Sequence, residues 1–119
     1  MQTSYFAKSG THPNAIAISA RVPEFYKGAR YTKLAPSWSI YSEWKNSTDH
    51  DEFKNEQYSI RFYNEILSKL NPKEVYEELC ALVEGEPILI CYESPGKFCH
   101  RHIIAIWLSV ALNIEIIEI

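Results

Sequence analysis

Two of the three cysteines and two of the four histidines in this sequence lie in one stretch, ICYESPGKFCHRHIIAIWL. Cys91 ends an apolar run, Glu93 follows two residues later, and Cys99, His100 and Arg101 open a second apolar run. A cysteine beside a histidine suits a nucleophile with its general base, and a carboxyl group can also transfer protons. The candidate catalytic residues are therefore Cys99, His100, Glu93 and Cys91.

The same stretch indicates a binding site for an anion. Residues 99–101 are expected to begin a helix, where unpaired backbone N–H groups and the helix dipole favour a negative ligand. An arginine in the first turn opposes that dipole, and a bound anion would offset the repulsion. Arg101 is therefore the first candidate anion-binding residue, and Lys97 in the loop and Arg21 after an earlier strand are further candidates.

Three tyrosines could contact the ligand, because a tyrosine ring can stack on a base and its hydroxyl can donate to a phosphate oxygen. These candidates for substrate contact are Tyr5, Tyr31 and Tyr63. Aromatic residues at such spacings are more often part of a hydrophobic core. The ligand class that fits the whole set is a small phosphorylated or nucleotide-like anion.

Two specific site motifs, a phosphatase loop and a zinc site, match the spacing of these residues poorly. A phosphatase-like C-x5-R loop starting at Cys91 would place Lys97 where the arginine belongs, and that loop holds a single glycine. A zinc site could instead draw on Cys91, Cys99, His100 and His102. The chain has no CxxC pair, however, and the two histidines should point to different sides of a helix. We therefore expect neither a metal ligand nor a cofactor.

The elements that position these residues are a strand, a helix and a second strand. PILICY is short, apolar and β-branched, as in a strand covered on both faces. The run that begins at CHRH is apolar on almost every side, which indicates a buried helix, and IEIIEI closes the chain as a strand. The two strands should be parallel with a right-handed crossover.

The rest of the chain is predicted to hold two strands and three helices. TSYFAKS and AIAISA are the strands, and residues 21–34 are a loop. Helices are expected over 35–46, over 52–70, and from Pro72, capped by Asn71, to about Val83. The long helix carries one apolar stripe, formed by Phe53, Ile60, Tyr63, Leu67 and Leu70. The predicted fold is a small three-layer α/β domain with a mainly parallel four-stranded sheet and helices on both faces.

Length and composition limit the organisation and the partners. The 119 residues suit a single domain, residues 1–119, and the net charge of −3 makes duplex nucleic acid an unexpected partner. No apolar run is long enough for a membrane span, and the first ten residues do not resemble a signal peptide. An odd number of cysteines, three, indicates a reducing compartment, and we expect a cytoplasmic protein. The final strand could sit at a sheet edge, where it could form a homodimer.

The segments LAPSW, YNEIL and above all LICYESPGKFCHRHIIAIWL resemble the family called domain of unknown function 488. Its members carry a strand ending in an LLCYE-like segment, then a loop, then CHR opening a helix. The resemblance runs from Thr3 to the final strand. It implies the fold and the location of the site but no reaction, and its pattern marks Arg21, Leu34, Ala35, Pro36, Tyr63, Cys91, Glu93, Cys99, His100 and Arg101.

Three roles for this junction remain open from the sequence. The first is an enzyme that holds an anion through Arg101 and uses a cysteine with His100 and Glu93. The second is a module that binds a nucleotide or a nucleic-acid end without chemistry. The third is a buried polar network that only fixes the loop.

Overall fold

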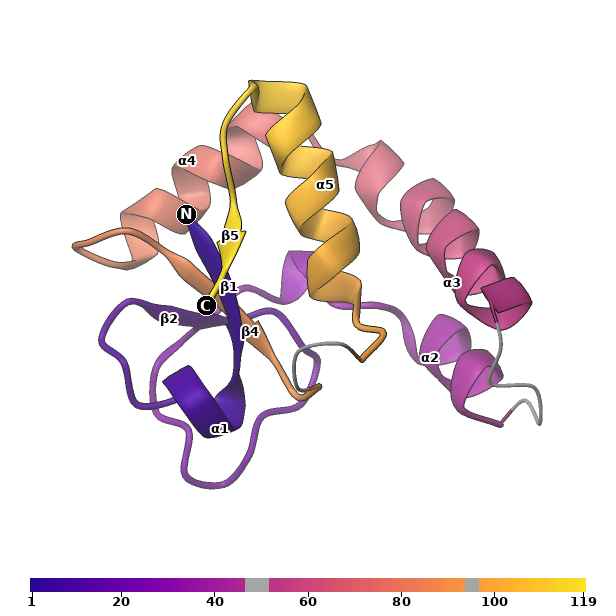
Figure 1. Ribbon diagram of the computed structural model, residues 1–119, viewed down its shortest axis with the longest axis horizontal. Helices are drawn as coiled ribbons and strands as arrows, with labels where there is room; N and C mark the ends of the chain where they lie inside the picture. The colour runs from indigo at the N-terminus through magenta and orange to yellow at the C-terminus, as the bar shows by residue number, and fades with distance from the viewer. Residues whose placement is uncertain (47–51, 94–96) are drawn as a thin grey trace.

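The computed structural model describes residues 1–46, 52–93 and 97–119, which form a parallel sheet covered mainly on one face (Figure 1). Its five strands have the order β3-β2-β4-β1-β5, and every pair of neighbours is parallel. They are β1 (Gln2–Tyr5), β2 (Ala15–Ala17), β3 (Ala29–Arg30), β4 (Ile88–Cys91) and β5 (Ile117–Glu118). The α/β class is confirmed. The sheet has one strand more than predicted, because the two-residue β3 forms in a segment expected to be loop.

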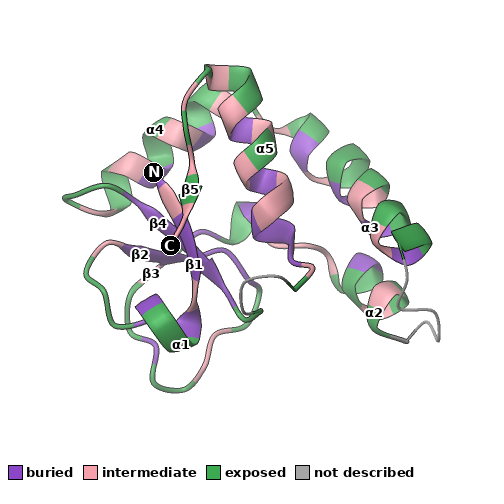
Figure 2. Ribbon diagram, viewed as in Figure 1, coloured by how far each residue is buried: buried purple, intermediate pink, exposed green. Residues whose placement is uncertain are grey.

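The helices of the described residues lie unequally on the two faces of the sheet. They are α1 (Phe6–Ser9), α2 (Trp38–Asn46), α3 (Glu52–Glu65), α4 (Pro72–Leu82) and α5 (His100–Leu112), with 3-10 turns η1 (Thr32–Leu34) and η2 (Leu67–Lys69). Side chains from α2 to α5 share one core with Ile16 and Leu89 of the sheet. The other face is covered by Phe6 of α1 and by Tyr26, so the third layer is thin. Figure 2 shows how completely β2 and β4 are buried between them.

The first predicted strand ends earlier than its composition indicates. Strand β1 stops at Tyr5, and residues 6–9 form the single helical turn α1. The Gly10 amide donates to the Phe6 carbonyl, and the hydroxyls of Ser4 and Ser9 hydrogen-bond at 2.7 Å. This turn places the Phe6 ring edge-on against Tyr26, with centroids 5.3 Å apart. Tertiary packing therefore overrides the β propensity of the segment.

Of the apolar stripe predicted on the long helix, Leu67 is buried and Leu70 packs against the core, but the first three positions do not. Phe53, Ile60 and Tyr63 are exposed, whereas the buried positions of α3 are Lys54, Tyr58 and Phe62. The helix also ends at Glu65 instead of continuing to residue 70. These three buried residues, one lysine and two aromatic residues, recur every four positions, a spacing that places side chains on one helix face.

Helix α4 and the strand-helix-strand unit that carries the candidate site are confirmed. Asn71 caps α4, since its Oδ1 accepts from the amides of Lys73 and Glu74 at 2.9 and 3.2 Å. All four residues of β4 are buried, as a strand covered on both faces requires. Strands β4 and β5 both lie beside β1 and run parallel to it. The predicted strand-helix-strand unit therefore exists, with β1 inserted between its two strands.

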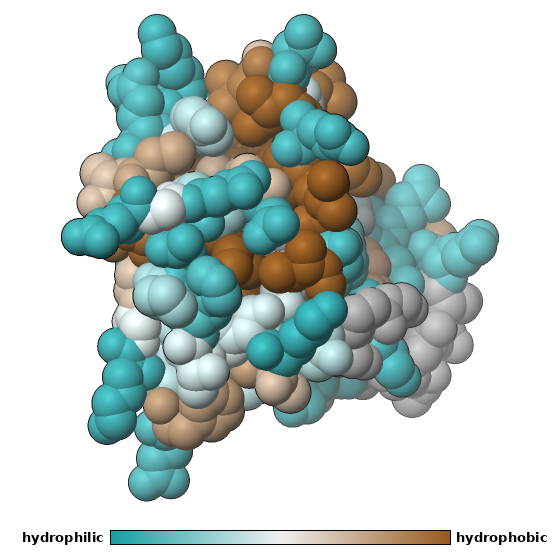
Figure 3. Space-filling model, turned by 60° about the vertical axis from the view of Figure 1, so that its left-hand side comes forward, coloured by the Kyte–Doolittle hydropathy of each residue, from teal (hydrophilic) through white to brown (hydrophobic). Residues whose placement is uncertain are grey.

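Two further features bear on partners. In the described part of the chain, no helix has the length and apolar character that crossing a membrane requires. Strand β5 lies at one edge of the sheet, and Figure 3 shows hydrophobic side chains gathered on one face of the molecule. Helix α5 and strand β5 leave Ile106, Val110 and Ile117 exposed. A homodimer formed through this region stays a prediction.

Candidate functional site

A cavity of about 500 Å³ opens beyond the carboxyl ends of β2 and β4. The two strands are neighbours, and the chain leaves β2 toward β3 but leaves β4 toward β5 at the opposite edge. In parallel sheets, such a reversal of direction creates a crevice that commonly holds ligands. The volume lies within the range of about 300–1,000 Å³ typical of small-molecule sites.

The wall of the cavity is mostly aromatic. Helix α2, helix α3 and the segments flanking β4 and α5 contribute the rings of Trp38, Tyr41, Trp44, Tyr58, Tyr92 and Phe98. Several of these rings support one another: Phe98 lies 5.7 Å from Trp44 and 5.1 Å from Tyr58 between centroids. The Trp44 indole also donates to Asn55 at 2.8 Å, which fixes its orientation. One side of the cavity is therefore a preformed surface for a flat, apolar group.

The polar groups of the cavity come from both strand ends. Ser19, Arg21 and Lys45 line it together with Cys91, Glu93, Cys99 and His100. Within residues 1–46, 52–93 and 97–119, the exposed guanidinium of Arg21 has no hydrogen-bond or ion-pair partner. Of the expected anion-binding residues, Arg21 is the one that the structure places at the cavity.

The expected role of Arg101 needs correction. Its side chain is fully buried and does not line the cavity. The guanidinium forms a two-point ion pair with Glu118, from Nε to Oε1 at 3.1 Å and from Nη2 to Oε2 at 2.7 Å. Its Nη1 donates to the Glu93 carbonyl and to the Cys91 sulfur. Arg101 therefore joins β5, β4 and the loop to α5, and its charge is already balanced by a carboxylate.

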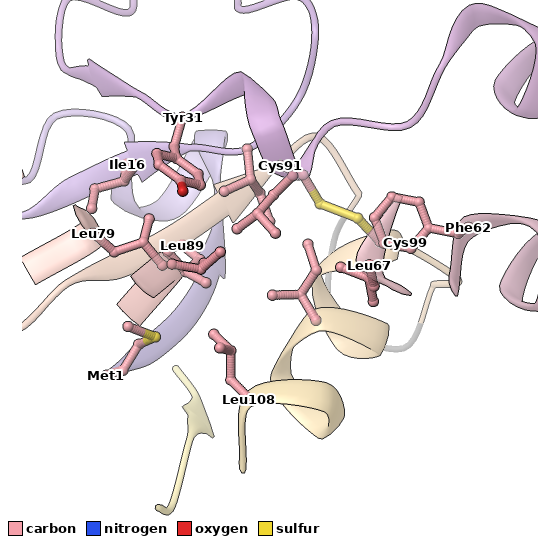
Figure 4. Close-up of a cluster of buried hydrophobic side chains, with 14 of the residues drawn as sticks. Met1, Ile16, Tyr31, Phe62, Leu67, Leu79, Leu89, Cys91, Cys99 and Leu108 are labelled. Carbon is pink, nitrogen blue, oxygen red and sulfur yellow. A yellow bond between two sulfur atoms is a disulfide. The ribbon is translucent and has the colours of Figure 1, made fainter. Parts of the chain in front are cut away.

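The two cysteines of the junction form a disulfide, which the sequence analysis did not predict. Cys91 at the end of β4 and Cys99 at the start of α5 are bonded, and both are almost fully buried. Figure 4 shows this bond beside Phe62 and Leu67 in the core. The Nη1 of Arg101 lies 3.0 Å from the Cys91 sulfur.

His100 is held as a neutral imidazole with its free nitrogen toward sulfur. Its Nε2 lies 2.8 Å from the Ile18 carbonyl oxygen, which can only accept, so Nε2 carries the proton. Its Nδ1 therefore presents a lone pair, 3.7 Å from the Cys99 sulfur. Burial is the largest cause that lowers the pKa of His100, to about 4, and the nearby charge of Arg101 lowers it further. The imidazole is thus an acceptor that lines the cavity.

Several predicted residues lie away from the cavity. Tyr5 ends β1, Tyr63 is exposed on α3, and Tyr31 donates to Glu78 at 2.9 Å; none of the three lines this cavity, and their contact with a substrate stays a prediction. Lys97 is exposed and does not line it either. Sequence reasoning missed the aromatic wall and Lys45. The three-residue spacing of Trp38, Tyr41 and Trp44 was a signal, but it indicated only a helix.

Comparison with known proteins gives a family and no activity. No curated protein and no solved structure is similar enough to match the chain. Residues 11–112 match a family model described as the active DUF488-N3 subclade, and this range contains the cavity, the disulfide and all of α5. The chain therefore belongs to the family DUF488-N3a.

Proposed function

We propose that the cavity binds a small ligand that combines a flat ring with a negative charge, a nucleotide-like anion. The observation that carries this proposal is the arrangement of the lining. Aromatic side chains form the wall, and Arg21, whose guanidinium has no partner among the described residues, lies near the carboxyl ends of the strands. A ligand with both features would use both parts of the cavity. The proposed site includes the cavity-lining residues of the 91–101 junction. Arg101 itself does not line the cavity; it donates hydrogen bonds to Cys91 and Glu93.

The aromatic wall supplies the stacking surface. The Trp38 side chain is 71% exposed and lines the cavity, so its ring is accessible to a ligand. Stacking of a base on an aromatic side chain contributes about 1–3 kcal/mol. A phosphate or carboxylate on the same ligand would meet Arg21 and Lys45, whose ammonium lies 5.5 Å from the Tyr41 ring centroid. A hydrogen bond to a charged group contributes about 1.5–3 kcal/mol.

Two versions of this function differ in the use of the cysteines. In an enzyme, the reduced Cys99 would transfer its proton to Nδ1 of His100 and attack an electrophilic atom of the ligand. The bond from that atom to the leaving group would then break, as His100 or Glu93 returns a proton to the leaving group. The description of the family as an active subclade supports this version. In a binding module, Cys91 and Cys99 stay joined as a disulfide and the cavity binds its ligand without reaction. The disulfide in the structure supports that version. Both versions require the same ligand class.

Calorimetric titration with three probes tests the shared requirement. AMP carries a ring and a charge, adenosine carries the ring alone, and inorganic phosphate carries the charge alone. AMP should bind more tightly than either of the other two, and Arg21→Ala should weaken AMP binding about tenfold to hundredfold. Lys73→Ala, which removes an exposed cation on α4, is the matched control and should bind as the wild type does. Equal binding of AMP and adenosine, or an unchanged affinity in Arg21→Ala, would contradict the proposal.

A second measurement separates the two versions. In the reduced protein, an enzyme of the proposed kind should show an alkylation rate of Cys99 that AMP slows. A binding module should bind AMP equally well after Cys99→Ser, whereas the enzyme version loses turnover in that variant. Cys80 lies outside the cavity on α4, so Cys80→Ser is a suitable background for the labelling.

A further inference from the structure

We infer that, when its disulfide is reduced, the protein binds one zinc-like divalent cation through Cys91, Cys99 and His100. One ligand atom from each of these residues lies within 4.8 Å of the other two, and all three residues are buried. The inference does not depend on the proposed nucleotide-like ligand. It concerns a different chemical group, held by the deep end of the same cavity.

The donor atoms suit zinc. Two thiolates and one imidazole are ligands that this ion prefers, and three protein ligands leave a fourth position open. Cys91, Cys99 and His100 all line the cavity, so a fourth ligand could reach the ion from that side. The sequence analysis rejected zinc because His100 and His102 diverge on the helix. The structure shows that His102 is not needed, because Cys91 reaches the site from β4.

Groups around the three ligands hold them in the state that a metal requires. The Ile18 carbonyl accepts from Nε2 of His100 at 2.8 Å, so the lone pair of Nδ1 is the one left for an ion. Metal-binding histidines typically donate their second nitrogen to such an acceptor. Nη1 of Arg101 donates to the Cys91 sulfur and helps to fix its position. These contacts exist without the metal and prearrange its ligands.

Charge balance also favours a cation. Reduction leaves two buried thiols, which stay neutral without a metal because two thiolates in the core would be costly. The single positive charge of Arg101 is paired with Glu118 and cannot offset two thiolates. A divalent cation matches the two negative charges that form when both thiols lose their protons. The ion can therefore hold the deprotonated pair of sulfurs that the disulfide otherwise joins.

The exchange between these two states can be written with balanced electrons and protons. An external dithiol passes two electrons and two protons to the Cys91–Cys99 bond, giving two thiols and one disulfide of the reductant. Binding of the cation then releases the two thiol protons to solvent. Zn–S bonds are about 2.3 Å long, so two sulfurs on one ion lie up to about 4 Å apart. The Cα atoms are 7.5 Å apart, which leaves room for that separation.

Cobalt titration of the reduced protein tests the site. The starting chain carries Cys80→Ser, so that only the paired cysteines remain, and it is reduced with a phosphine before Co²⁺ is added. We expect one equivalent of Co²⁺ to produce the thiolate-to-metal charge-transfer absorption and the intense visible bands of a tetrahedral ion. Cys99→Ser and His100→Gln should each weaken binding at least tenfold. His102→Gln, a neighbouring histidine outside the ligand set, should not.

The unmodified chain provides a test that does not depend on the folding of variants. The oxidised protein should bind no Co²⁺, and reoxidation of the zinc-loaded protein should release one equivalent of Zn²⁺ to a chromophoric chelator. Failure of the reduced, folded protein to bind Co²⁺ would overturn the inference. Equal binding before and after oxidation would overturn it as well. AMP binding, measured on the oxidised protein, is a separate result and can succeed or fail independently.

Discussion

Replacement of Glu118 by glutamine should destabilise the protein strongly, although this residue lies next to the end of the chain. Arg101 is fully buried, and the Glu118 carboxylate is its only ionic partner among the described residues. Removal of one member of a buried pair costs about 3–5 kcal/mol, because the other charge stays buried without compensation. Glutamine keeps one oxygen acceptor and the Glu118 side chain is 27% exposed, so we expect the lower value, about 3 kcal/mol.

Urea denaturation followed by circular dichroism measures this loss. With a slope of about 1–3 kcal/mol per molar urea, the midpoint should fall by roughly 1–3 M while the slope stays the same. Glu115→Gln is the matched control, since Glu115 is exposed three residues earlier and should change the midpoint little. A loss below about 1 kcal/mol in Glu118→Gln would show that Arg101 does not depend on this carboxylate, and would refute the reasoning.

The same pair predicts the direction of a pH effect. Burial raises the pKa of Glu118, but hydrogen bonds from Arg101 and Thr3 and the charge of Arg101 outweigh it, so the folded-state pKa lies below the ordinary 4.5. A carboxyl group with a lowered folded pKa stabilises the fold above its unfolded pKa, and that contribution is lost as pH falls through the folded value. The stability difference between wild type and Glu118→Gln should therefore shrink below pH 4.5. A difference that stays constant there would contradict the pairing.

Three other predictions follow from the site and its support. The pKa of His100 is lowered from 6.5 to about 4. The oxidised protein should therefore lose roughly 3 kcal/mol of stability as pH falls through that interval. In a series of denaturation curves at different pH values, His100→Gln should reduce this loss. In the same denaturation assay, Phe62→Ala should cost about 3–5 kcal/mol because Phe62 is fully buried, whereas Ile60→Ala should cost under about 1 kcal/mol because Ile60 is 47% exposed. Similar losses in the two variants would show that Ile60 faces the core, as the sequence pattern predicted. Trp38→Ala should leave the melting temperature within about 2 °C of the wild type but weaken AMP binding in calorimetry by about 1–3 kcal/mol; unchanged affinity would remove this ring from the site.

The local parts of the junction could be predicted from the sequence because their signals are local. Asn71 and Pro72 mark the start of α4 through capping geometry that involves only the next few residues. The apolar run of β4 and the long apolar helix α5 follow from composition and period. These elements placed the site at the end of β4, and the cavity lies there.

The partners across the junction could not be predicted, because they depend on tertiary contacts. From the sequence, Arg101 could bind an anion or form an ion pair with Glu93 or the chain end, and local pattern could not decide between them. Its carboxylate comes from Glu118, 17 residues later, in β5 on the far side of β1. The aromatic wall comes from α2 and α3, which no local pattern links to β4. The Cys91–Cys99 bond likewise depends on how the loop returns to the strand.

The most direct test of the central claim uses the three tryptophans as reporters of position. Trp38 and Trp44 line the cavity, whereas Trp107 on α5 does not. In a ¹⁵N-labelled sample titrated with AMP, the indole N–H resonances of Trp38 and Trp44 should shift together and saturably, and that of Trp107 should stay in place. No shift at saturating AMP, or a shift of Trp107 alone, would contradict binding of a nucleotide-like anion in this cavity.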